Sequence, residues 1–164
     1  MQDGAVDKEG VILISKNAFS EICIKPESGM RFLRSLCTIK KEAIITAFKE
    51  NGYFYEPSCF TIQTELNKHI SLFPFLLKYT NHSCDPNVFF DTTSMLLIAI
   101  KDIEAGDEFC YFYPSTELRM AQPFFCNCGS KNCLGEITGA STIPKDILNK
   151  YRLTDFIRSQ IFDI

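Results

Sequence analysis

The chain lacks tryptophan, has only two histidines and carries no long run of lysine or arginine among its 164 residues, whose formal net charge is −3. Without clustered cations to displace counterions from phosphates, direct nucleic-acid binding is not expected. The mildly acidic balance instead favours a basic peptide partner. Long apolar runs are also missing, since "VILI" (11–14) is too short for a signal-peptide core or a membrane span. We therefore expect no membrane association and a cytoplasmic location, with a nucleus as the alternative.

Eight cysteines are present, and without secretion they should be reduced thiols rather than disulfides. They fall into two kinds. Three crowd into "FFCNCGSKNCLGEI" (124–137), and Cys84 stands in the polar stretch "YTNHSCDPNVFF" (79–90). The other four stand alone among apolar neighbours and are most simply small buried hydrophobes: Cys23, Cys37, Cys59 and Cys110.

The clustered cysteines at 126–133 predict a metal site, because three thiolates lie within eight residues and Gly129 permits a tight reversal between them. A structural zinc site usually has four ligands, so one must come from elsewhere. His82 and Cys84 are both candidates, and His69 is a weaker one. Cys84 is preferred because its neighbours form a rigid loop. The alternative, three free thiols in a surface turn, is disfavoured because such thiols oxidise readily.

The composition, 46% hydrophobic, suits one domain with a proper core. Short runs rich in Ile, Phe and Tyr recur between turn-forming residues and predict a mainly β protein of several small sheets. Residues 88–100 predict a hairpin that turns at "DTTS". Three helical segments are predicted: a turn or two in "SLFPFLLKYT" (71–80), a helix in "STIPKDILNKY" (141–151) with a Ser or Thr N-cap and Pro144 in its first turn, and a short helix from Thr154 to Ile161.

Three ordered motifs resemble those of the SET-domain protein lysine methyltransferases with a cysteine-rich post-SET zinc segment. They are "NHSCDPN" (81–87), "AGDEFCYFY" (105–113) and the cysteine cluster followed by Gly135. "TIQ" (61–63) and "STELRMAQPFFCNCGSKNCLGEITG" (115–139) are similar to small stand-alone SET proteins of the bacterial type. The resemblance extends from about residue 60 to about residue 140.

The resemblance implies a SET fold: mainly β, with small sheets, few helices, and the "NHSC" segment threaded under a loop as a pseudoknot. Zinc would hold the post-SET segment, and short helices would end the chain. The divisions expected are a SET domain over 1–120, a post-SET zinc segment over 121–140 and a helical tail over 141–164. Within the first, the first strands and cofactor turn cover 11–48, a variable insert 49–70, and the pseudoknot with the catalytic strand 71–113.

The resemblance also implies site residues. S-adenosylmethionine and the target lysine would enter from opposite faces, with Tyr113 as the catalytic tyrosine where they meet. Asn81 and His82 would hold the cofactor, and Phe124 or Phe125 would pack on its adenine. Backbone groups of Gly29, Met30 and Arg31 would face the methionine carboxylate of the cofactor. The zinc ligands would be Cys84, Cys126, Cys128 and Cys133.

Tyr111 resembles the family's Phe/Tyr switch, and a tyrosine there predicts mainly monomethyllysine, with some dimethyllysine as the alternative. Three positions depart from the family pattern: Arg31 stands where a second glycine is usual, Glu42 replaces a later turn glycine, and Phe112 replaces an acidic residue. The preferred reading is an S-adenosylmethionine-dependent methyltransferase acting on a lysine of a protein. The alternatives are a catalytically silent SET fold that binds a partner or methylated peptide, and a zinc-stabilised interaction domain without cofactor.

Overall fold

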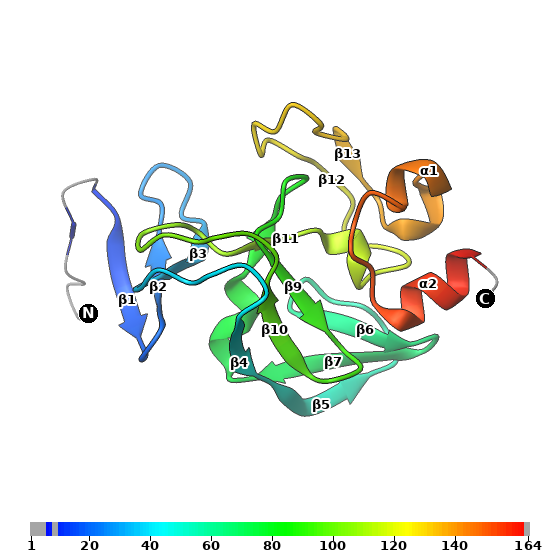
Figure 1. Ribbon diagram of the computed structural model, residues 1–164, viewed down its shortest axis with the longest axis horizontal. Coiled ribbons are helices and arrows are strands. Elements are labelled where there is room, and N and C mark those ends of the chain that lie inside the picture. Colours follow the sequence, from blue (N-terminus) through cyan, green and yellow to red (C-terminus); the bar gives the residue numbers. More distant parts are fainter. Residues whose placement is uncertain (1–5, 8–9, 163–164) are drawn as a thin grey trace.

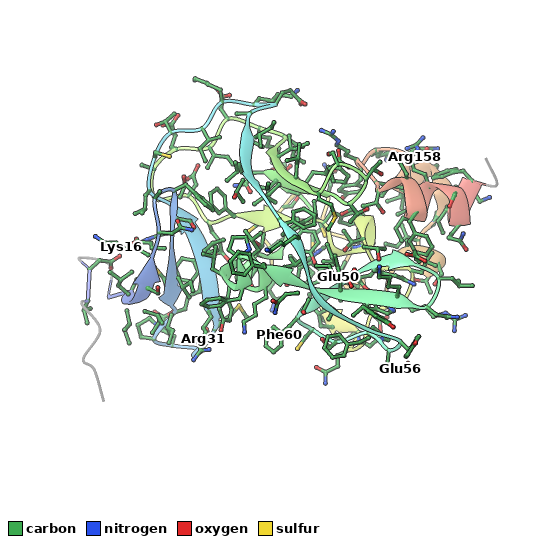
Figure 2. The ribbon with its side chains drawn as sticks, turned by 90° about the horizontal axis from the view of Figure 1, so that it is seen from below. Lys16, Arg31, Glu50, Glu56, Phe60 and Arg158 are labelled. Atoms are coloured by element: carbon green, nitrogen blue, oxygen red, sulfur yellow. The ribbon has the colours of Figure 1, made fainter. Side chains whose placement is uncertain are left out.

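The computed structural model describes residues 6, 7 and 10–162. Within this part of the chain the strands form five small sheets, and the helices are short (Figure 1). The prediction of a mainly β protein with several small sheets is therefore confirmed. None of the helices described is long and apolar enough to cross a membrane. Lys16 of the first strand and Arg158 of the last helix lie at opposite ends of the molecule (Figure 2).

The first sheet has the antiparallel order β1-β2-β3. Its strands are β1 (Ile12–Lys16), β2 (Ser20–Ile24) and β3 (Arg31–Ser35). Its inner side is apolar, because Ile22 and Leu33 are buried in the main core. The β2–β3 turn ends at Gly29, whose φ of 68° is readily adopted only by glycine.

Two more sheets complete the main core. The order β4-β10-β9 joins β4 (Ile44–Ala47), β10 (Leu96–Ala99) and β9 (Val88–Asp91). The hairpin predicted over 88–100 is confirmed, and Asp91 holds its turn by accepting the backbone N–H groups of Thr93 and Ser94. The third sheet has the order β5-β7-β6, with β5 (Lys49–Phe54), β7 (Lys68–Phe73) and β6 (Thr61–Glu65).

The polar stretch around Cys84 lies at the centre of the molecule. After the 3-10 helix η1 (Phe75–Tyr79), β8 (Asn81–His82) pairs in parallel with β11 (Cys110–Tyr111), which comes nearly thirty residues later. The Asn87 side chain ties the same two segments, since it accepts the Cys110 N–H at 2.8 Å and donates to the Glu108 carbonyl at 2.9 Å. Asn87 therefore fixes the loop against the strand.

In the view of Figure 1, the last part of the chain lies above and to the right of β11. It contains the sheet of β12 (Phe124–Phe125) and β13 (Glu136–Ile137), the 3-10 helix η3 (Ala140–Thr142), and the helices α1 (Lys145–Leu148) and α2 (Asp155–Phe162). A second core cluster joins Phe112 to this region, and its ring stacks on Tyr151 at a centroid distance of 3.7 Å. Replacing the family's acidic residue by Phe112 thus gives the tail an apolar anchor.

Several local predictions need correction. Tyr113 is not on the strand, because Pro114 cannot continue the backbone ladder, and the 3-10 helix η2 (Tyr113–Ser115) begins instead. Cys37 and Cys59 are exposed rather than buried, and Cys110 is half-buried. The N-cap position of α1 is Pro144 itself, without a side-chain cap. The second C-terminal helix is confirmed, with the Thr154 hydroxyl accepting the Ile157 N–H at 3.3 Å.

Candidate functional site

The site begins at β8, where Asn81 and His82 stand beside β11. The Asn81 amide donates to Glu108 Oε1 at 2.8 Å and to the Arg31 carbonyl at 3.1 Å. These bonds join the pseudoknot segment to the first sheet and to the start of β11. The asparagine side chain is therefore fixed in place at the wall of the neighbouring cavity.

His82 lies between the start of η2 and the cysteine cluster. Its Nδ1 accepts the Tyr113 backbone N–H at 3.2 Å, and its Nε2 lies 3.4 Å from Cys84 Sγ. Burial lowers the pKa of His82 to about 4, so the ring is neutral near pH 7. Because Nδ1 is an acceptor, the proton belongs on Nε2, where it points to sulfur. His82 thus supports the cysteine cluster from outside it.

The four predicted metal ligands are brought together, with all four sulfur atoms within 4.8 Å of one another. Tetrahedral zinc with Zn–S bonds of about 2.3 Å places its sulfurs about 3.8 Å apart, and Cys84 and Cys126 are 4.0 Å apart. The Leu134 N–H points to Cys84 Sγ at 3.4 Å, as it would to a thiolate. This donor set fits zinc. His69, the weaker candidate, lies elsewhere, beside Glu117.

The thiols differ in how easily they ionise. Burial alone would raise the pKa of Cys128, but backbone groups of Cys84 and Ser130 and the nearby Cys126 and Cys133 thiols lower it to about 6. Burial raises the pKa of Cys126 to about 11. A metal cation would favour the thiolate form of all four cysteines.

A cavity of about 560 Å³ opens between the first sheet, β8 and the post-SET segment. It is lined by most of the predicted cofactor residues: Met30, Asn81, His82, Tyr113, Phe124 and Phe125. Gly29 and Arg31 are not among its lining residues. The Arg31 guanidinium turns away and donates to the Tyr79 hydroxyl at 3.0 Å, so it does not crowd the cavity. Arg31 and Phe60 lie along the same side of the molecule (Figure 2).

Sequence reasoning missed two charged residues of this cavity. Lys25 and Glu108 both line it, and Lys25 Nζ lies 2.9 Å from Glu108 Oε2. They are 83 residues apart, so no local pattern joins them. The one available signal was the position of Glu108 within the quoted "AGDEFCYFY" motif. The pair places one positive and one negative group at the same cavity wall.

The later turn that departs from the family pattern, at Glu42, keeps a glycine-like backbone. Glu42 has a φ of 66°, in the left-handed region that glycine favours. Its N–H donates to the Ala99 carbonyl at 2.7 Å, which fixes the turn against β10. The turn therefore has the expected conformation although it lacks the expected residue.

A second cavity, of about 290 Å³, lies on the other side of Tyr113. Tyr113 and Phe124 line both cavities, and their ring centroids are 6.0 Å apart. The Tyr111 ring lies 4.7 Å from that of Tyr113. Of these two cavities, Tyr111 lines the second but not the first. The two cavities therefore share an aromatic boundary.

Tyr111 is buried and Tyr113 is half-buried, and both side chains are neutral. Burial raises the pKa of Tyr113 and that of Tyr111 well above the ordinary value. The Tyr113 hydroxyl faces the Thr80 carbonyl at 3.4 Å. Neutral hydroxyls between two cavities can orient a reacting amine or methyl group by hydrogen bonding without themselves ionising.

Comparisons with known proteins identify a domain family and several methyltransferase relatives. A family model described as "SET domain" matches residues 10–114, more than half of the chain. A methyltransferase of Aspergillus flavus, flvH, is 40% identical over 100 residues, which cover 60% of this chain and 56% of that protein. An H3 lysine-36-specific histone-lysine N-methyltransferase of Aspergillus oryzae is 37% identical over 68 residues, covering 38% of this chain and 7% of the relative. The chain thus spans little more than half of the first relative and a small part of the second.

Among solved structures, the methyltransferase domain of the human histone-lysine N-methyltransferase SETMAR matches with a TM-score of 0.49 and 18% identity. The match covers 70% of this chain and 56% of that one.

Proposed function

Because the chain belongs to the SET-domain family, we propose that it is an S-adenosylmethionine-dependent methyltransferase acting on the side-chain amine of a lysine in a protein or peptide. The observation that carries the proposal is the pair of cavities that meet at Tyr113 and Phe124. A donor held on one side and an amine on the other would face each other across this boundary. Such a fixed alignment supplies much of the rate of an in-line displacement.

The larger cavity fits the cofactor. Phe124 would pack on its adenine, while Asn81 and His82 would hold it through their backbone. Lys25 and Glu108 match its zwitterionic end, with Lys25 facing the carboxylate and Glu108 the ammonium group. These charged side chains would do what the family's second glycine does through its backbone, and this explains how Arg31 is tolerated.

Bound S-adenosylmethionine would supply a methyl group from its sulfonium. The chain's own residues would exclude water and orient the amine. The Tyr113 hydroxyl would hold the amine in line with the methyl group. The aromatic walls would disfavour the charged ammonium form of lysine. Tyr111, which is 7% exposed, would limit the room for an amine that is already methylated. We therefore propose that monomethyllysine is the main product.

Zinc has a structural part in this proposal. Cys84 belongs to the pseudoknot segment, whereas Cys126, Cys128 and Cys133 belong to the segment that carries Phe124 and Phe125. A metal bound by all four would dock the two aromatic residues over the larger cavity. The Cys₄ site would then govern cofactor binding without taking part in the chemistry.

A histone tail is the first substrate to test, because a relative is named as specific for H3 lysine 36 and the net charge of −3 suits a basic peptide. The experiment combines calorimetry with S-adenosylhomocysteine and mass spectrometry of an H3 peptide centred on lysine 36 after incubation with S-adenosylmethionine. We expect binding and addition of one methyl group. Absence of cofactor binding by zinc-loaded protein would instead favour a silent SET fold that binds a partner, whereas binding without peptide methylation would refute the histone substrate alone.

A further inference from the structure

Glu117 places a buried carboxylate in the smaller cavity. It follows η2, six residues after Tyr111, and lines the cavity together with Tyr111 and Tyr113. Its side chain is only 6% exposed. Burying a carboxylate is costly unless charge or hydrogen bonds compensate it. A carboxylate that nevertheless faces a substrate-sized space is a candidate for contact with a cationic ligand.

The two oxygens of this carboxylate are held differently. Oε1 accepts the Gln63 backbone N–H at 2.8 Å and lies 3.4 Å from the Thr116 hydroxyl. Oε2 lies 3.5 Å from His69 Nδ1, and this long contact is not a well-directed hydrogen bond. Among the described residues, no lysine or arginine forms an ion pair with Glu117. Oε2 therefore keeps the capacity to accept a proton.

The surroundings of Glu117 contain few groups that could replace it. The titratable groups that face it are His69 from β7, Tyr111 from β11, Tyr113 from η2 and Cys59 across the same cavity. The two tyrosines are neutral. Burial also raises the pKa of Glu117, which makes its carboxylate a better base than an exposed one.

We propose that Glu117 accepts the proton that the substrate ammonium must lose. The proton passes from the lysine nitrogen to Oε2, which leaves a neutral amine and a neutral carboxyl group. The nitrogen lone pair then forms the bond to the methyl carbon as the carbon–sulfur bond breaks, giving a methylammonium product and a neutral thioether. Glu117 returns its proton to solvent after the product leaves. The inference rests on the proposed function.

The decisive variant is Glu117→Gln, because glutamine keeps an oxygen that can accept the Gln63 N–H but cannot take the proton. Without the base, the substrate must be neutral before it binds, so the acid limb of kcat/KM moves toward the amine pKa of about 10.4. We expect methylation of the H3 peptide to fall about 100-fold at pH 7 and to recover most of this loss near pH 10. Glu65→Gln, at the exposed end of β6, is the matched control.

A purely structural role for Glu117 predicts the same loss at every pH, and this outcome, or no loss, would overturn the proposal. Binding of S-adenosylhomocysteine should be unchanged at each pH, since Glu117 does not line the larger cavity. If Glu117→Gln does not fold, the test uses the wild-type protein. The dependence of kcat/KM on pH is then measured with two peptides, one with lysine and one with aminoethylcysteine, whose amines differ in pKa. The acid limb stays in place if Glu117 is the base and follows the amine if it is not.

Should the H3 peptide not be methylated, a binding experiment separates this inference from the choice of substrate. The probe is n-butylammonium, which matches the lysine side chain, added in the presence of S-adenosylhomocysteine. The NMR signal of Met120, another residue of the cavity wall, reports binding. Glu117→Gln should weaken binding about tenfold, and equal binding by variant and wild type would refute a contact between Glu117 and the substrate amine.

Discussion

The two cavities of the site differ in how their charges are arranged, although they share Tyr113 and Phe124. The larger one has a matched pair, with Lys25 and Glu108 2.9 Å apart at the same wall. The smaller one has the single carboxylate of Glu117, which lies 3.5 Å from His69 Nδ1. A matched pair suits a ligand end that carries both charges. A single carboxylate suits a ligand that arrives positive and must become neutral.

The cavities also differ in what closes them. The larger cavity depends on the post-SET segment, which contributes Phe124 to Cys128 and is held by the cysteine cluster. The smaller cavity takes Ala121 to Phe124 from the same segment, none of them a cluster cysteine, and its other walls come from β11, η2 and the chain around the start of β6. Loss of metal should therefore affect the donor side before the amine side. The following predictions test this division, beginning with the largest effect.

Removing zinc should abolish binding on the donor side. Chelation, or Cys128→Ser, should release the post-SET segment and eliminate binding of S-adenosylhomocysteine, with methyl transfer lost as a result. Calorimetry and metal analysis by mass spectrometry measure the two effects. Cys37→Ser is the control, because this exposed thiol lies outside the cluster and the variant should keep its zinc. Cofactor binding by metal-free protein at wild-type affinity would contradict the coupling.

Tyr113→Phe should separate chemistry from binding at the shared boundary. Loss of the hydroxyl should lower kcat about 100-fold or more, because a hydrogen bond aimed at the reacting centre is lost. The affinity for S-adenosylhomocysteine should stay near that of wild type, since the ring that lines both cavities is retained. Tyr53→Phe, on the exposed strand β5, controls for the loss of a hydroxyl elsewhere. A variant with full activity would remove Tyr113 from its catalytic role.

Lys25→Met should lower the affinity of the larger cavity for ligands that carry an amino-acid end. We expect S-adenosylhomocysteine to bind about five- to tenfold more weakly, because its carboxylate loses a cation and meets an unpaired Glu108. Binding of 5′-methylthioadenosine, which lacks the amino-acid end, should not change. Calorimetry with both ligands makes this comparison, and Lys40→Met serves as the surface control. Equal losses for both ligands would mean that Lys25 acts on the cavity as a whole.

Tyr111→Phe should change the product more than the rate. The variant removes one buried hydroxyl beside the amine, and the added room should shift the product from monomethyllysine toward dimethyl- and trimethyllysine, with at most a few-fold change in turnover. Mass spectrometry of the methylated peptide over time measures the distribution. An unchanged product state would show that the hydroxyl is not the restriction, and efficient trimethylation by the wild type would refute the monomethylation proposal.

Much of the centre could be predicted because its residues lie in dense motifs. Zinc chemistry linked Cys84 to the cluster at 126–133, and the sulfur atoms do converge. The residues that sequence reasoning missed are single charges without periodicity: Lys25, Glu108 and Glu117 acquire meaning only when the fold places them at a cavity. The divisions at residues 120 and 140, the bacterial type and the cytoplasmic location stay predictions.

The third sheet shows another limit of pattern reasoning. Residues 49–70, the predicted variable insert, contain β5 and β6 and the start of β7. All six residues of β5 are exposed, so the strand has no alternation of apolar and polar residues to detect. Tyr113 lies in η2 rather than on the predicted strand, because β11 ends at Tyr111, where its pairing with the distant strand β8 ends.

The stack between Phe112 and Tyr151 has a consequence for the order of events during protein synthesis. Tyr151 also donates its hydroxyl to the Cys84 carbonyl at 2.9 Å, so a late residue supports the loop that carries an early ligand. All four cluster cysteines leave the ribosome before Tyr151 does, because synthesis proceeds from the N-terminus. A nascent chain can therefore capture metal while its tail is still being made. The contacts of Tyr151 with Phe112 and the Cys84 carbonyl can form only after the tail has been made.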